Sequence, residues 1–117
     1  MAGTFSTIAR NQALDGITVD RVSLHSADPS TTGANYITAG GKQAATFDAG
    51  GTQAVGERRL TGDIAFTGMS ALQTVTHFGF WLNSGDVFKG GVALTGDQAA
   101  NAAGEYTLKA TTSKMTA

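Results

Sequence analysis

The sequence predicts a mainly β protein: one antiparallel β-sandwich of about six strands, preceded by a short N-terminal helix. Three observations predict this fold class. Short stretches of alternating or β-branched residues recur with turn residues about every 8–12 positions. The chain has 117 residues, the length of one domain, so residues 1–117 are expected to form a single domain. The 16 Gly residues and the single Pro lie mainly between these stretches. The sequence contains no tandem repeat.

Residues 4–15 form the one predicted helix. Thr4 or Ser6 can cap its start, and Gly16 stands where helices commonly end. A helix of this length is marginal alone, so we expect its apolar face to dock on the domain or on a neighbouring chain. That face is formed by Phe5, Ile8, Ala9, Ala13 and Leu14.

Strands alternate with turns after the helix. In the first strand the alternation slips, which indicates a bulge or a start near Asp20. A long loop of turn formers is expected at 26–41 and a loop or irregular edge at 49–59. Gly90-Gly91 is predicted as a bulge, and the polar tail at about 112–117 as an arm. The strands are expected at 17–24, 43–48, 60–67, 74–82, 87–94 and 105–111.

The stretch TVTHFGFWL (74–82) is the strongest strand signal, and both of its faces are apolar in places. Since side chains alternate along a strand, Phe78 and Phe80 must point away from Trp81. We therefore expect one face to be covered by the helix or by another chain. The predicted core consists of Val22, Leu24, Phe47, Ile64, Phe66, Val75, Phe78, Phe80, Trp81, Val92, Leu94, Tyr106 and Leu108.

Composition excludes several classes of function. The absence of Cys removes disulfides, thiolate catalysis and zinc–cysteine sites. Eight Lys and Arg against nine Asp and Glu leave no basic patch for nucleic acid. No apolar run approaches the ~18 residues that span a membrane, and the first residues lack a signal-peptide pattern. Since 19 of the 48 hydrophobic residues are Ala, the core is thin, and partner chains are expected to add stability.

The two histidines are the main candidates for chemistry. His25, His77 and Asp28 could bind a metal, but a His within a strand more often hydrogen-bonds a neighbour. Ser23 or Ser26 with His25 and Asp28 could form a hydrolytic triad, although triads are recognised by geometry and the chain has no G-x-S-x-G. We therefore expect no enzyme activity, no metal and no cofactor.

Contacts with a partner protein are a further possible role for polar and aromatic residues. Glu57-Arg58-Arg59 is the one local charge cluster, either a solvated loop or a grip on an acidic patch of a partner. Trp81 is expected in the core or as an interface anchor, with a ligand-stacking platform as the alternative. The residues predicted to contact a partner are Phe5, Ile8, Arg10, Leu14, Asp28, Asn35, Tyr36, Glu57, Arg58, Arg59 and Trp81.

Several blocks resemble, in the same order, segments of small tailed-bacteriophage virion proteins. VSLHSADPSTTGANYITAGG (22–41) is similar to a strand ending in SLHTADP followed by TGANE and Gly. TVTHFGFWLNSGDVFKGGVAL (74–94) is similar to a TVTHVGLWDAATGG-x-L-x-x-GAL hairpin, and NAAGEYTLKA (101–110) to NAGD-x-L-x-F. GKQAATF (41–47) lacks the Tyr and Arg of the family's YAR-x-A-x-x-F strand. The resemblance covers residues 11–110.

This resemblance implies a β-sandwich structural protein of the virion, made in the host cytoplasm. Relatives carry labels such as capsid decoration or tail-fibre-like protein. A compact chain without repeats or a stalk favours a decoration (cement) protein on the outside of the capsid. Its implied partners are the major capsid protein and copies of itself, as a dimer or trimer. The alternative is a tail or tail-fibre-associated structural or receptor-binding module, with residues 26–41 and Trp81 forming a receptor or glycan site.

Overall fold

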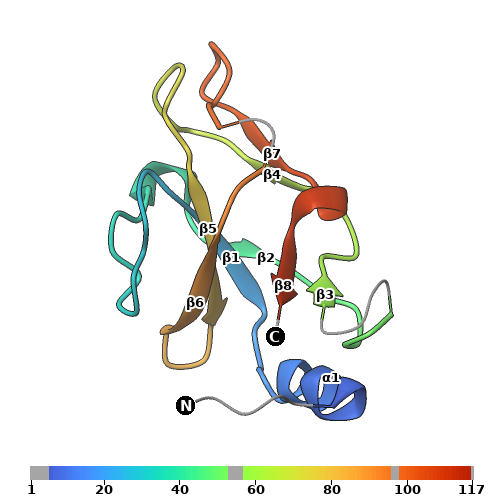
Figure 1. Cartoon of the computed structure of the whole chain (residues 1–117). Helices are drawn as coiled ribbons and strands as arrows, with labels where there is room; N and C mark the ends of the chain where they lie inside the picture. The colour runs from blue at the N-terminus through green and yellow to red at the C-terminus, as the bar shows by residue number, and fades with distance from the viewer. Residues whose placement is uncertain (1–5, 53–56, 96–97, 117) are drawn as a thin grey trace.

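The computed structural model describes residues 6–52, 57–95 and 98–116. Over these ranges the chain is mainly antiparallel β with one short helix, which confirms the predicted fold class (Figure 1). No helix in the described part is long and apolar enough to cross a membrane. The elements are α1 (Thr7–Asp15), β1 (Arg21–His25), β2 (Gln43–Ala44), β3 (Glu57–Arg59), β4 (Ile64–Phe66), β5 (His77–Leu82), β6 (Val87–Ala93), β7 (Tyr106–Leu108) and β8 (Lys114–Thr116), with 3-10 turns at Thr38–Gly40 and Ala110–Thr112.

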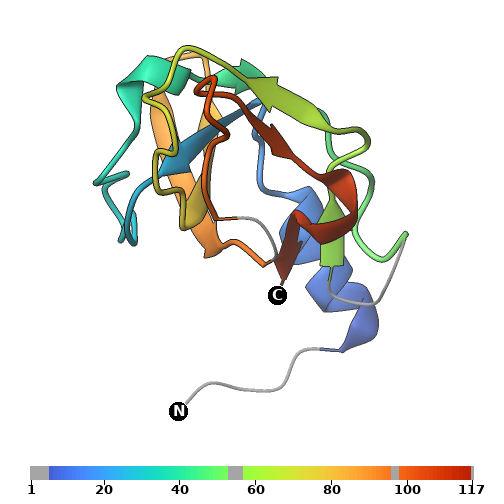
Figure 2. The same ribbon diagram turned by 90° about the horizontal axis from the view of Figure 1, so that it is seen from above.

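Four strands form the main sheet, in the order β2-β1-β5-β6. Two small sheets, β3-β8 and β4-β7, lie on one side of it (Figure 2). Between them lies the core, because Phe78 and Phe80 of β5 point inward and meet Phe66 of β4, Leu108 of β7 and Met115 of β8. The arrangement buries the larger apolar side chains that alternate along each strand.

The predicted core is confirmed, with one difference. Trp81 is also buried, but it lies on the opposite face of the main sheet, outside this cluster. Phe47, Ile64 and Val92 are half-buried and pack against the cluster. The predicted residues that are fully buried in it are Val22, Leu24, Phe66, Val75, Phe78, Phe80, Leu94, Tyr106 and Leu108.

Residues 57–59 and 114–116 differ from the expectation of a loop and a polar arm. They form β3 and β8, which pair with each other so that Arg58 lies opposite Met115. Met115 is almost fully buried and joins the core. The prediction of an arm over 114–116 was therefore wrong. Strands of three residues in a polar sequence show too little alternation of apolar and polar residues to be recognised.

The first strand begins at Arg21, as the slip in its alternation indicated. The predicted bulge in β6 is present one residue before the glycines. Phe80 pairs with Gly90 while Trp81 pairs with Phe88, so Lys89 is the extra residue. The bulge thus brings Phe88 beside Trp81 on the same face of the sheet.

Helix α1 lies at one end of the molecule, near β3 (Figure 1). Ser6 caps it, since its Oγ accepts the amide of Ala9 at 3.2 Å. Asp15 holds the far end by accepting the Gly50 amide at 2.7 Å. Ile8 is 70% exposed, so this part of the predicted stripe does not dock on the domain. Phe5 and the side chain of Leu14 lie outside the described residues.

Candidate functional site

The outer face of the main sheet is covered by residues 26–36, which we call the strap. The residues that follow turn to the core, where Ile37 is buried and Gly40 lies against Met69 and Phe66. Gly33 lies so close to Trp81 that a Cβ there would stand 3.0 Å from the indole. Pro29 is fully buried and sits directly over Gly91 of β6. The expectation that the helix or another chain covers this face was wrong, because a loop of the same chain does so.

Local turn chemistry shapes the strap. The Asp28 carboxylate accepts the Ser30 amide at 2.8 Å, and Ser30 takes a left-handed φ of 57°. Asn35, with φ 61°, donates its side-chain amide to the Asp28 carbonyl at 3.0 Å. Asp28 and Asn35, both predicted to contact a partner, are exposed and hold the turn together.

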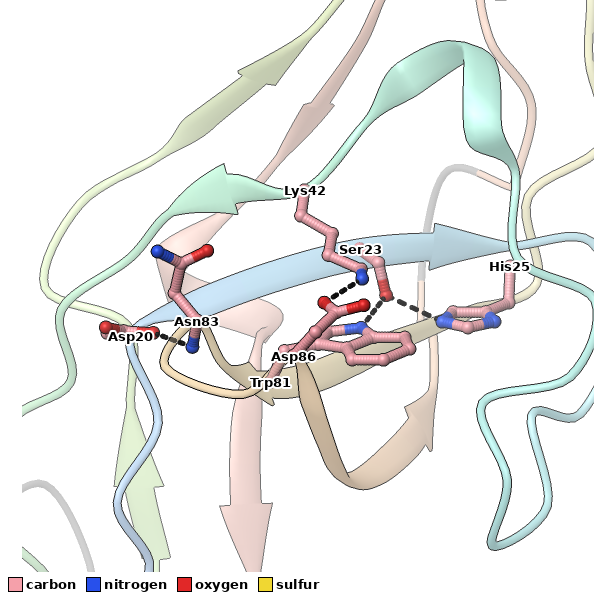
Figure 3. Close-up of polar contacts among 7 residues, drawn as sticks. All are labelled: Asp20, Ser23, His25, Lys42, Trp81, Asn83 and Asp86. Carbon is pink, nitrogen blue, oxygen red and sulfur yellow. Dashed lines mark hydrogen bonds and ion pairs between the residues drawn. The ribbon is translucent and has the colours of Figure 1, made fainter.

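A chain of hydrogen bonds lies beneath the strap (Figure 3). The Trp81 indole N–H donates to Ser23 Oγ at 2.6 Å, and Ser23 Oγ lies 2.7 Å from His25 Nε2. His25 Nδ1 lies 2.8 Å from the carbonyl oxygen of Ala34 in the strap. A carbonyl can only accept, so Nδ1 carries the proton, Nε2 accepts, and the Ser23 hydroxyl donates to it. Burial lowers the pKa of His25 and favours this neutral form.

The contacts of Ser23, His25 and Trp81 also bear on whether these residues could act in catalysis. Ser23 and His25 are hydrogen-bonded as in a nucleophile–base pair, but both are fully buried and the Trp81 N–H occupies the serine oxygen. Asp28 binds Ser30 and does not orient the imidazole. The hydrolytic triad considered as an alternative from the sequence therefore does not form with Ser23, and the Ser23–His25 pair attaches the strap to the sheet.

His25 and His77 are direct neighbours across β1 and β5, which sequence reasoning did not place together. His77 Nδ1 lies 2.8 Å from Thr76 Oγ1. Among the described residues, no three His, Asp or Glu side chains are grouped as metal ligands. The arrangement places two imidazoles close together and lowers the pKa of His25 further.

Lys42 closes the edge of the strap and was missed from the sequence. Its ammonium lies 3.7 Å from the centroid of the Trp81 ring and 5.3 Å from that of Tyr36, and it pairs with Asp86 (Figure 3). Burial raises the pKa of Tyr36, so the phenol stays protonated. Trp81 is 8% exposed and covered by these groups. Its indole packs within the chain and offers no open stacking surface.

The Glu57-Arg58-Arg59 cluster is used largely within the chain. Arg58 donates to the carbonyl of Asp48 at 2.7 Å and to that of Ile17 at 2.9 Å, joining the segment after α1 to β3. Arg59 pairs with Glu57 at 3.1 Å, and Lys114 of β8 pairs with Glu57 at 2.7 Å. Hydrogen bonds from Lys114 and Arg59 lower the pKa of Glu57. Arg10, another predicted contact, lies half-buried on α1.

The other end of the molecule is formed by two loops that we call the tip, residues 68–75 and 98–104 (Figure 1). Hydrogen bonds join them, from the Leu72 amide to Asn101 at 3.0 Å and from the Ala100 amide to Gln73 at 2.8 Å. Leu72 has a left-handed φ of 59° and is 67% exposed. The tip contains no charged residue. It is unusual for a branched residue to adopt a left-handed φ while its side chain is exposed to solvent.

A hollow of about 600 Å³ lies beside the tip. It is lined by Phe66 and Tyr106, by the polar residues Asn101, Glu105 and Lys109, and otherwise by Ala and Thr residues. Glu105 accepts the Asn101 side-chain amide at 3.3 Å. Lys109 pairs at 3.4 Å with the carboxylate of Asp63, which does not line this hollow. In comparisons with known proteins, no family model, curated protein or solved structure matches this chain.

Proposed function

We propose that this chain is a bacteriophage capsid decoration protein that binds the outside of the major capsid protein lattice and stabilises the head. The class is supported by the blocks of residues 11–110 that resemble small virion proteins. The observation that carries the proposed mode of action is the exposure of a large apolar side chain at each end of the molecule. These are Ile8 on α1 and Leu72 at the tip.

A protein that clamps a shell has to contact two neighbouring subunits. The chain is 45 Å long and 27 × 26 Å across, so its two ends can reach different subunits. Burying one Leu or Ile side chain contributes about 1.5–3 kcal/mol, which is modest for a single contact. Because both ends are on one chain, the second contact forms at a high effective concentration and binding is tight.

The composition of the contact surfaces fits a protein partner. The tip is uncharged, and the whole chain has 15% charged residues and a net charge of -1. Such a surface loses little free energy of solvation when it is covered by another protein. Ser23 and His25 are buried and bonded to each other, and Arg58 donates to a backbone carbonyl of the same chain. These contacts fit a structural role for the three residues better than a catalytic one.

Adding the purified chain back to heads that lack it tests this role. We expect saturable binding to the shell and an upward shift in the temperature at which heads release their DNA, followed by dye fluorescence on heating. The reason is that a ligand of the intact shell stabilises it by mass action. Binding to tails, with no change in the release temperature, would contradict the proposal and support the tail-associated alternative.

A further inference from the structure

The strap is attached to the main sheet through one titratable side chain. Besides the bond from His25 Nδ1 to Ala34, backbone bonds join the Ser26 amide to Asn35 at 3.1 Å and the Ile37 amide to the Leu24 carbonyl at 2.9 Å. Only the His25 contact depends on a proton, because the other groups do not titrate in water near neutral pH.

The hydrogen-bond chain has a fixed direction that a second proton on His25 would reverse. An imidazolium donates from both nitrogens, so Nε2 would no longer accept from Ser23. The Ser23 hydroxyl cannot turn to Trp81, because the indole N–H is itself a donor. Protonation would therefore leave a buried hydroxyl hydrogen without the acceptor it now has and place a charge beneath the strap.

The groups that face His25 do not compensate such a charge. His77 approaches from β5 and disfavours protonation. Tyr36 of the strap presents a protonated phenol, its ring 6.0 Å from the imidazole, and β6 presents Phe88 at 6.1 Å. Lys42 lies beyond Tyr36 and is paired with Asp86. Within the described residues no carboxylate interacts with His25.

We propose that the strap is an acid-labile cover that opens when His25 takes up a proton and exposes the aromatic cluster of Tyr36, Trp81 and Phe88. The core on the opposite face of the sheet contains no histidine and keeps its packing. Opening is thus local to residues 26–36, because Ile37 packs in that core. This inference does not depend on the proposed role in the capsid.

The pH range in which the strap is expected to open follows from the burial of His25. Burial holds the pKa of the closed form below the ordinary value of about 6.5, so the closed strap binds fewer protons than the open one. The free energy that favours the closed strap is therefore greatest above about pH 6.5 and falls as the pH falls below it. With one proton involved, the open population rises by up to about tenfold per pH unit.

Hydrogen exchange on the full chain between pH 7.5 and 5.0 tests the proposal, since ordinary carboxylates titrate below this window, at about 4. We expect the protection factor of the Ser26 amide, which bonds to the Asn35 carbonyl, to fall with pH while that of the Phe80 amide in β5 does not. Trp81, the sole tryptophan, reports the same event as a red shift and greater quenching by acrylamide. Equal loss of protection at Ser26 and Phe80 would mean global acid unfolding and would overturn the proposal.

The two histidines provide a matched pair of variants. His25→Gln should remove the pH dependence of Trp81 emission, whereas His77→Gln should keep it. If His25→Gln does not fold, an NMR titration of the wild-type imidazoles decides the matter. The protection factor of the Ser26 amide must then follow the titration of His25. The inference would be contradicted if strap opening followed the protonation of His77, or if the Trp81 emission stayed constant down to pH 5.0.

Discussion

Replacing Leu72 with Gly is expected to weaken binding to the capsid by about tenfold or more while the fold stays intact. The side chain is 67% exposed, so the isolated chain loses little packing when it is removed. Its backbone φ of 59° costs a branched residue about 1–2 kcal/mol, a strain that Gly does not have. Burial of a Leu in an interface contributes about 1.5–3 kcal/mol, which corresponds to a tenfold change in affinity or more.

Co-sedimentation with heads measures this loss, and thermal unfolding of the free protein measures the stability. The matched control is Val87→Thr, which changes an exposed apolar side chain in the β5–β6 hairpin, away from the tip. We expect the control to bind like the wild type. Unchanged binding of Leu72→Gly would show that the tip does not contact the shell.

Replacing Gly79 with Ala is expected to lower the stability of the protein by about 3 kcal/mol, or roughly 10 °C in Tm. A Cβ at this position would lie 2.7 Å from His25 Nε2, 2.9 Å from Ser23 Oγ and 3.0 Å from the Phe88 ring. All three neighbours are held by buried packing or hydrogen bonds. The methyl group would therefore disrupt the bonds that attach the strap, in addition to overpacking the site.

Gly62→Ala is the control for the glycine substitution itself. Of the described residues, none comes within 4 Å of a Cβ at Gly62. Its stability should stay within about 0.5 kcal/mol of the wild type. If calorimetry gave Gly79→Ala and Gly62→Ala the same Tm, the close packing of strap, Ser23 and His25 described above would be incorrect.

Much of the fold could be predicted from strong local patterns. The stretch 74–82 predicted the central strand β5, and the turn residues after it predicted the hairpin to β6. The alternation of Tyr106 and Leu108 predicted β7. These elements are recognisable because large apolar residues recur at the spacing of a strand, which is a property of the segment itself.

The candidate site was harder to predict because its contacts join distant segments. Ser23 and Trp81 are 58 residues apart in the chain, and only the pairing of β1 with β5 brings them together. Lys42 reaches Trp81 from the strand edge without any motif that marks it. Leu72 could not be singled out, since its exposure and positive φ follow from how the two tip loops pair. Arg58 was predicted to face a partner, but it donates to two backbone carbonyls that only the fold brings near it.

The number of copies of this chain per major capsid protein, measured by quantitative mass spectrometry of purified particles, tests the proposed role most directly. A clamp that follows the symmetry of the shell should be present at about one copy for every one to three capsid subunits. Fewer than about one copy in fifty would place the chain at the tail or at a single vertex, where repeated contacts with the lattice are impossible, and would contradict the account.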